Sequence, residues 1–219
     1  MANYNDIKYP NAVSSNATGL SGGWNLLKTQ TVTAGSSVSA VDFIHGTSSV
    51  VFDSTYEAYL IMYTMVHPSV QKPEFQWAPG DGDFTDDKHS ANFIMRSNNT
   101  ESDVDGGGDP SNISIVVGYD DTHHSNSKTA AEVVVMNVGN GNDQSCSGQI
   151  YITDAGETDT WKVFLADGIG DSMGYNDEME SSHAGGMIRQ TGAIDRFRFN
   201  FSSGNIDVGL FSLYGFSKS

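Results

Sequence analysis

The stretch Ala193–Phe216, AIDRFRFNFSSGNIDVGLFSLYGF, decides the fold class of this chain. Phe197, Phe199 and Phe201 alternate with arginine and asparagine, which is the two-residue period of a strand with one buried face. Alternation of this kind, with a turn signal directly after it, is typical of antiparallel sheets that pack on one side only. The stretch therefore predicts a β-protein whose last strands help to build the core.

A turn signal joins the two halves of this stretch. Gly204-Asn205 has the sequence of a two-residue hairpin loop, with glycine at the first central position. This loop length pairs the residues of one shared face: Phe201 with Val208, and Phe199 with Leu210. We therefore expect a closing β-hairpin in which these phenylalanine and aliphatic side chains pack together.

The rest of the chain repeats this pattern of short β-branched and aromatic segments between Gly, Asn, Asp and Ser clusters. The segment Tyr56–His67 is apolar on both alternating faces, which favours a central strand covered on both sides over a helix. We expect an edge strand at Pro73–Ala78 and the longest loop at Asp167–Gly186. The count of about ten to twelve strands, with little or no helix, predicts an all-β antiparallel β-sandwich or jelly roll.

One domain accounts for most of the chain. Residues 24–219 are expected to form a single β-sandwich. Residues 1–23 are rich in Asn, Ser and Gly without a period, and form either an arm that docks on a neighbouring subunit or a loosely held terminus. Neither a signal peptide nor a membrane-spanning run is visible in the sequence.

The charge balance excludes several kinds of partner. With 11 basic and 27 acidic residues the formal net charge is −16, and no basic stripe is present to bind phosphates. Binding to nucleic acid and to anionic membranes is therefore not expected. Cys146 is the single cysteine, so stability has to come from packing or from association rather than from an internal disulfide.

An acidic loop is the main candidate for a metal site. Asp81, Asp83 and Asp87 lie in DGDFTDD, and oxygen ligands at alternate positions suit Ca²⁺. The loop does not have the spacing of an EF-hand, and a solvated acidic loop explains the same residues. The sequence therefore leaves two alternatives: the protein has no cofactor, or this loop binds Ca²⁺.

Aromatic residues near loops are candidates for recognition of a surface glycan. Trp77 precedes the acidic loop, and Tyr119 and Tyr175 lie at the edges of expected loops. Exposed Trp and Tyr rings can stack on sugar rings, whereas core packing is the alternative for the same residues.

No catalytic constellation is visible in the sequence. Cys146 has no basic neighbour that would lower the pKa of its thiol, and a Gly-x-Ser-x-Gly elbow does not occur. A paired-carboxylate site depends on spatial proximity, which the sequence does not show. We therefore expect a protein that is not an enzyme.

Three segments resemble a family of virion structural proteins from tailed bacteriophages, especially those of marine and cyanobacterial hosts. They are the opening WNLLKTQTVTA at 24–34, the segment FDSTYEAYLI at 52–61, and the closing IDRFRFNFSSGNI at 194–206 followed by Leu213-Tyr214-Gly215. The SSGNI…LYG ending is the most specific of them. Acidic insertions at Asp81–Asp87, Asn98–Pro110 and Asp167–Ser182 depart from the family pattern.

This resemblance implies a role but no catalytic residues. It implies a non-enzymatic β-sandwich displayed on the virion, either as a head decoration protein or as a short tail-fibre subunit. A carbohydrate-binding fibre tip that recognises a host receptor is the alternative. The expected partners are other capsid or tail subunits and copies of the chain itself, with a trimer as one arrangement. The expected location is the virion, after synthesis in the host cytoplasm.

Overall fold

The computed structural model describes residues 23–97, 113–117, 124–128, 131–172 and 178–217. Thirteen strands lie in these ranges, and the described residues contain no helix. The strands are β1 (Trp24–Val32), β2 (Val41–Ile44), β3 (Tyr56–Pro68), β4 (Phe75–Gly80), β5 (Lys88–Ser97), β6 (Ile113–Val117), β7 (His124–Lys128), β8 (Glu132–Val135), β9 (Cys146–Thr153), β10 (Lys162–Ser172), β11 (Glu178–Ile188), β12 (Arg196–Phe201) and β13 (Ile206–Ser217). The predicted all-β antiparallel sandwich is confirmed.

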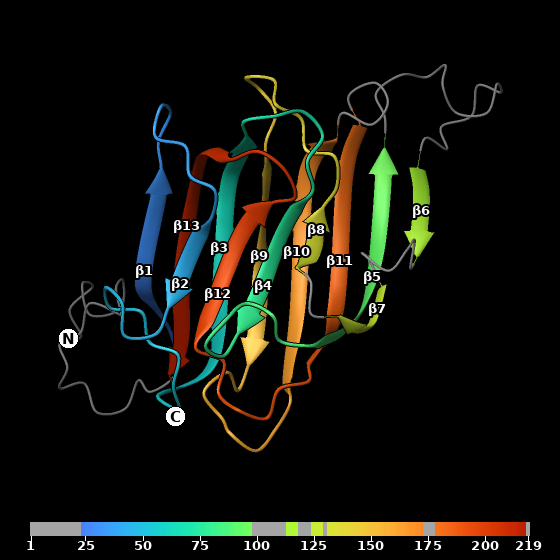
Figure 1. Ribbon diagram of the computed structural model, residues 1–219. Coiled ribbons are helices and arrows are strands. Elements are labelled where there is room, and N and C mark those ends of the chain that lie inside the picture. Colours follow the sequence, from blue (N-terminus) through green and yellow to red (C-terminus); the bar gives the residue numbers. More distant parts are fainter. Residues whose placement is uncertain (1–22, 98–112, 118–123, 129–130, 173–177, 218–219) are drawn as a thin grey trace, which may run out of the picture.

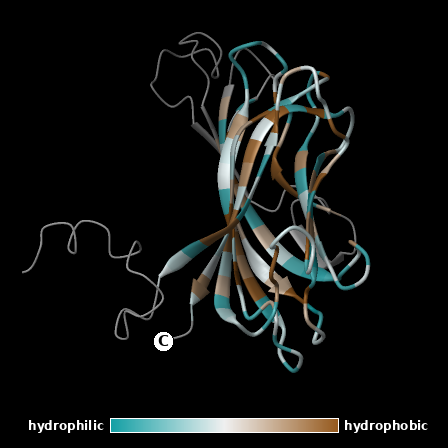
Figure 2. Cartoon of the chain, turned by 90° about the vertical axis from the view of Figure 1, so that its left-hand side faces the viewer, coloured by the Kyte–Doolittle hydropathy of each residue, from teal (hydrophilic) through white to brown (hydrophobic). Residues whose placement is uncertain are grey.

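Two sheets of unequal width form the layers of the sandwich (Figure 1). The large sheet has nine strands in the order β1-β13-β3-β9-β10-β11-β5-β6, with β7 also paired to β5. The small sheet has four strands in the order β2-β12-β4-β8. Figure 2 shows the two layers edge-on, with the small sheet covering one face of the large one. The opposite face of the large sheet, which we call the outer face, has no layer over it among the described residues.

The closing stretch does not form the predicted hairpin. Strand β12 pairs with β2 and β4 in the small sheet, whereas β13 pairs with β1 and β3 in the large sheet. The segment around Gly204 is therefore an arch that carries the chain from one layer to the other. Gly204 has a φ of +71°, and a Cβ there would come within 2.7 Å of the Val70 side chain. Glycine is thus required both by the backbone conformation and by the close packing of the arch.

The buried face of β12 was predicted correctly, but that of β13 was not. Phe197, Phe199 and Phe201 are all buried. On β13 the core positions are Phe211 and Leu213, which are both fully buried. Leu210, which was expected opposite Phe199, is 41% exposed on the outer face, and Val208 is half-buried. Both faces of β13 carry apolar residues, so the alternating pattern alone did not determine which face is buried.

An aromatic cluster joins the two layers. The Phe199 ring lies 6.1 Å from Phe75 of the small sheet, 6.2 Å from Tyr63 and 5.6 Å from Phe211 of the large sheet, measured between ring centroids. Such offset and tilted pairs stabilise beyond the area that they bury. The same continuous core extends from Val32 through Leu213.

Three further expectations need correction. Strand β3 is central, but its large buried side chains, Tyr59, Ile61 and Tyr63, lie on the inner face, and no described element covers the outer face. Strand β4 lies between β12 and β8 and is not an edge strand. The expected loop at 167–186 is mostly the long hairpin of β10 and β11, whose alternation is obscured by small residues.

A buried lysine links the loops at one end of the sandwich. Lys162 is fully buried, and its Nζ lies 2.6–3.2 Å from five backbone carbonyl oxygens, which share its three N–H donors. Two of these carbonyls belong to the loop before β10, at Glu157 and Thr160. The other three belong to residues 190–192, after β11. The ammonium group thus satisfies carbonyls that would otherwise be buried without donors.

Candidate functional site

The structure places the predicted recognition residue Trp77 in the core. Trp77 is fully buried on β4, with its ring centroid 5.0 Å from that of Phe164. Of the two interpretations of Trp77, core packing is confirmed and surface recognition is wrong, because β4 lies inside the small sheet and its alternate residues point toward the large one. Tyr119 and Tyr175 lie outside the described residues.

The acidic loop does not gather its carboxylates. Hydrogen bonds from the Thr85 amide and hydroxyl to Asp83 Oδ1, at 3.0 and 2.6 Å, lower the pKa of Asp83. Asp87 lies 3.4 Å from Arg189, and Asp81 is exposed. Across the described residues, no group of three or more His, Cys, Asp or Glu side chains is arranged to hold a metal ion. The structure thus does not bring Asp81, Asp83 and Asp87 together as calcium ligands.

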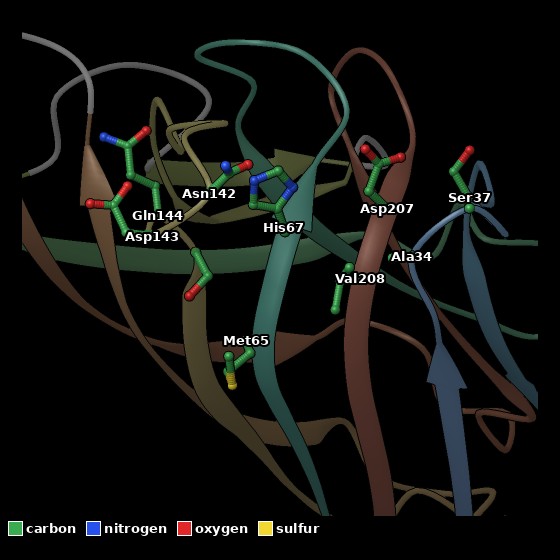
Figure 3. Close-up of a pocket in the computed structure, with 11 residues that line it drawn as sticks. Ala34, Ser37, Met65, His67, Asn142, Asp143, Gln144, Asp207 and Val208 are labelled. Atoms are coloured by element: carbon green, nitrogen blue, oxygen red, sulfur yellow. The ribbon is translucent and has the colours of Figure 1, made fainter.

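A pocket of about 500 Å³ opens at the end of the sandwich near the arch (Figure 3). Four segments line it: the turn after β1, the end of β3, the loop before β9 and the start of β13. The lining combines carboxylate, amide, hydroxyl and imidazole groups with short apolar side chains. It is formed by Ala34, Gly35, Ser37, Met65, His67, Asn142, Asp143, Gln144, Ser145, Asp207 and Val208.

Local hydrogen bonds hold the walls of this pocket in place. The Gln144 side chain is buried and accepts the Gly141 amide at 2.8 Å, which closes the loop before β9. His67 Nε2 lies 3.0 Å from the carbonyl oxygen of Gly141, so the same residue also orients the imidazole.

A β-bulge aims Met65 at the opening of the pocket. The register of β3 with β9 shifts between Tyr63 and Val66, and Met65 has a φ of +52°. Its amide donates to Ser147 Oγ at 3.0 Å, and its side chain is 64% exposed. Bulges and positive φ values of this kind are frequent where a strand presents a side chain to a ligand.

A Ser–His–Asp row lies on the outer face. His183 Nδ1 is 2.8 Å from Asp167 Oδ1, and His183 Nε2 is 3.3 Å from Ser181 Oγ. Sequence reasoning missed this arrangement because it placed all three residues in a loop. Their spacing on paired strands, with Ser181 and His183 two residues apart, was the available signal.

This row lacks the other parts of an acyl-transfer site. Strands β10 and β11 are interior strands, so their backbone amides are used in the ladders with β9 and β5. The backbone amides of β10 and β11 beside Ser181 are therefore not free to bind an oxyanion. Cys146 is not an alternative nucleophile, since burial raises the pKa of its thiol. The geometry supports a hydrogen-bonded polar row rather than a catalytic centre.

Two apolar rows cross the outer face beside this polar row. Cross-strand register places their members side by side from β1 to β11. The first apolar row consists of Trp24, Phe216, Ala58, Thr153, Val163 and Met187, and the second consists of Leu26, Tyr214, Leu60, Tyr151, Leu165 and Gly185. Val163, Leu165 and Leu26 are 50–58% exposed. Aromatic and aliphatic side chains thus lie beside one another in rows on the surface of a strongly acidic protein.

Comparison with known proteins gives no match: no family model, no curated protein and no solved structure is significantly similar to this chain. The part of the chain that the structure describes also holds no helix long and apolar enough to cross a membrane. Function is therefore argued from the surfaces described above.

Proposed function

We propose that this chain is a non-enzymatic structural protein of a tailed-bacteriophage virion, displayed on the particle surface as a head-decoration or short tail-appendage subunit. The observation that carries the proposal is the outer face of the large sheet. Contiguous apolar rows on a rigid sheet are typical of surfaces that another protein covers. A subunit that assembles through such a face needs no catalytic centre.

The three segments that resemble phage virion proteins become neighbours in the fold, which supports treating them as one unit. They contribute β1, the start of β3, all of β12 with the arch, and part of β13. Strands β1, β13 and β3 are adjacent at one side of the large sheet, whereas β12 lies in the small sheet. A Cβ at Gly215 would come within 2.6 Å of the Tyr56 ring, so the glycine of the closing LYG segment is needed by the tyrosine of the middle segment. The motif residues thus depend on one another physically.

Mass spectrometry of purified particles tests this proposal. The chain should be present in virions of the phage that encodes it, and its copy number should separate a decoration protein with hundreds of copies from an appendage with few. Virions that contain none of the chain would reject the proposal.

Recognition of a neutral glycan is the second candidate function, and the pocket of Figure 3 is the observation that favours it. Its hydroxyl, amide and carboxylate groups suit the hydrogen bonds of a polyhydroxylated ring, while Met65 and Val208 offer apolar contact. Asp143 and Asp207 disfavour anionic sugars by charge repulsion.

A glycan array with the purified chain, with and without calcium, tests this second function. A hit should weaken at least about tenfold in an Asn142→Ala variant, which loses one pair of hydrogen bonds in the pocket. The exposed loop variant Asp159→Ala, remote from the pocket lining, serves as the control. An array without hits, or a hit that Asn142→Ala leaves unchanged, would exclude the pocket as a glycan site.

A further inference from the structure

We infer that the outer face of the large sheet is a self-association surface, and that a second copy of this chain packs on it face to face. This inference extends the proposed assembly role. It rests on that proposal in one premise, which is that another protein chain covers the outer face. Three features of the face select the occupant: its area, its charge and its shape.

The area of the outer face matches that of a stable dimer. Seven strands from β1 to β5, about 4.8 Å apart, span about 35 Å with their margins, and three rows spaced about 6.8 Å apart along the strands cover about 20 Å. The row through Asp167 and His183 crosses all seven strands and the two apolar rows cross six, so the three rows together cover about 620 Å² per copy. A face-to-face pair would bury about 1,240 Å², which lies at the lower end of the range of specific stable interfaces.

The charge of the outer face favours a copy of the same chain. The cross-strand row through Asp167 and His183 contains one carboxylate, and the two apolar rows contain none; its other members are Thr29, Ser212, Met62, Gln149 and Phe93. That carboxylate, Asp167, is already bound by His183 and accepts the Gln149 amide at 3.3 Å. A chain with net charge −16 repels its copies at most surfaces, and this face lets two copies meet without opposed carboxylates.

A positively charged partner would bind elsewhere on the molecule. The apolar rows offer it no carboxylates, whereas the acidic loops at the ends of the sandwich do. The outer face instead suits a neighbour that is itself apolar and sheet-like.

The shape of the outer face is that of a broad sheet surface, which a second sheet can cover. Two sheets pack face to face about 10 Å apart with strands nearly aligned, and the side chains of the two faces interdigitate. Five of the six residues of the second apolar row are large, and the Leu165 side chain lies over Gly185, where a Cβ would be 3.4 Å from it. Because the same patch is used on both copies, the contact is isologous and closes as a two-fold dimer.

Sedimentation velocity of the full chain, over about 1–100 μM, tests the inference. The sedimentation data for the wild-type chain should give a mass twice that of the 23.5 kDa monomer. Leu165→Glu places opposed carboxylates in the centre of the face and should raise the dissociation constant at least about 100-fold. The matched control is Thr47→Glu, which adds the same charge at an exposed residue of the loop after β2, outside the outer face, and it should stay dimeric.

Circular dichroism separates loss of association from loss of folding, and Leu26→Glu repeats the test at a more distant position if Leu165→Glu does not fold. Oxidation of methionines by peroxide gives an independent readout, because Met62 and Met187 should be protected in the wild type and oxidised faster in Leu165→Glu. A monomeric wild type at all concentrations would overturn the inference, as would an oligomer that both folded Glu variants retain. A trimer that Leu165→Glu dissociates would overturn the two-fold arrangement.

These results are independent of the particle experiment. A dimer of the purified chain that is absent from virions would reject the virion role and keep the self-association face. A chain that is present in virions but monomeric in solution would reject the self-association face and keep the virion role.

Discussion

Two leucines on β13 distinguish the arch from a hairpin. In the structure Leu213 is fully buried between the sheets, whereas Leu210 is 41% exposed on the outer face. The hairpin expected from the sequence would bury Leu210 beside Phe199 and turn Leu213 outward. Truncation of each leucine to alanine removes the same atoms from the same strand, so the two variants form a matched pair.

The expected difference in stability is large. Leu213→Ala should lower the free energy of unfolding by about 3 kcal/mol, within the range for a fully buried leucine whose cavity does not collapse. Leu210→Ala should lower it by less than about 1 kcal/mol, because much of its side chain is already in water. With a urea m-value of about 2.5 kcal/mol/M, the first variant shifts the midpoint by about 1.2 M and the second by less than about 0.4 M.

Urea unfolding followed by far-ultraviolet circular dichroism and by tryptophan fluorescence, to which the buried Trp77 contributes, measures both shifts. The titrations should be run at several low protein concentrations, because self-association would add to the apparent stability of the dimer. Equal losses for the two variants, or a larger loss for Leu210→Ala, would refute the assignment of β12 and β13 to different sheets.

Three other changes have defined outcomes. Lys162→Met should lower the free energy of unfolding by about 2–4 kcal/mol, because it leaves buried carbonyls without a donor, and exposed Lys72→Met should be nearly neutral by the same urea titration. Gly204→Ala and Gly35→Ala both force alanine to a positive φ and should each cost about 1 kcal/mol, but only the first meets neighbouring atoms and should cost at least about 1 kcal/mol more in thermal unfolding. Burial, and then the nearby carboxylates of the same loop, raise the pKa of Asp86 in the folded protein above its ordinary value of 3.8. The folded protein therefore loses stability as the pH rises from the pKa of the unfolded chain to that of the folded protein. Asp86→Asn should therefore be more stable than the wild type at pH 7, by up to about 1 kcal/mol, with a smaller difference at pH 4; a constant difference across that range would contradict the assigned cause.

The fold class could be predicted from sequence because it depends on local periodicity. Phe197, Phe199 and Phe201 alternate with polar residues whichever sheet they join, so their burial follows from the strand period alone. The arch could not be predicted in the same way. Strand β12 pairs with Val41–Ile44, more than 150 residues earlier in the chain, and no local signal reports so distant a partner. A turn sequence such as SSGN fits both a hairpin and an arch.

The candidate site was harder to predict than the fold. Trp77 was linked to the acidic loop by sequence proximity, although its alternation with Phe75 on the same strand was a sign that both side chains point into the core. The pocket near the arch gathers four segments that are distant in sequence, and His67 offered no spacing that would indicate it. The apolar rows likewise depend on cross-strand register, which short strands rich in small residues do not specify.

The arch also has a consequence for biosynthesis. Strand β12 lies between β2 and β4, and β13 lies between β1 and β3, so residues 196–217 supply an interior strand to each layer. Strands made early on the ribosome therefore lack their central partners until this segment emerges. Neither sheet is complete before residues 196–217 have been synthesised. Termination of translation within this segment would leave two sheets with unpaired strand edges, which promote aggregation and degradation. Folding of both sheets can therefore be completed only after the arch and β13 have been translated.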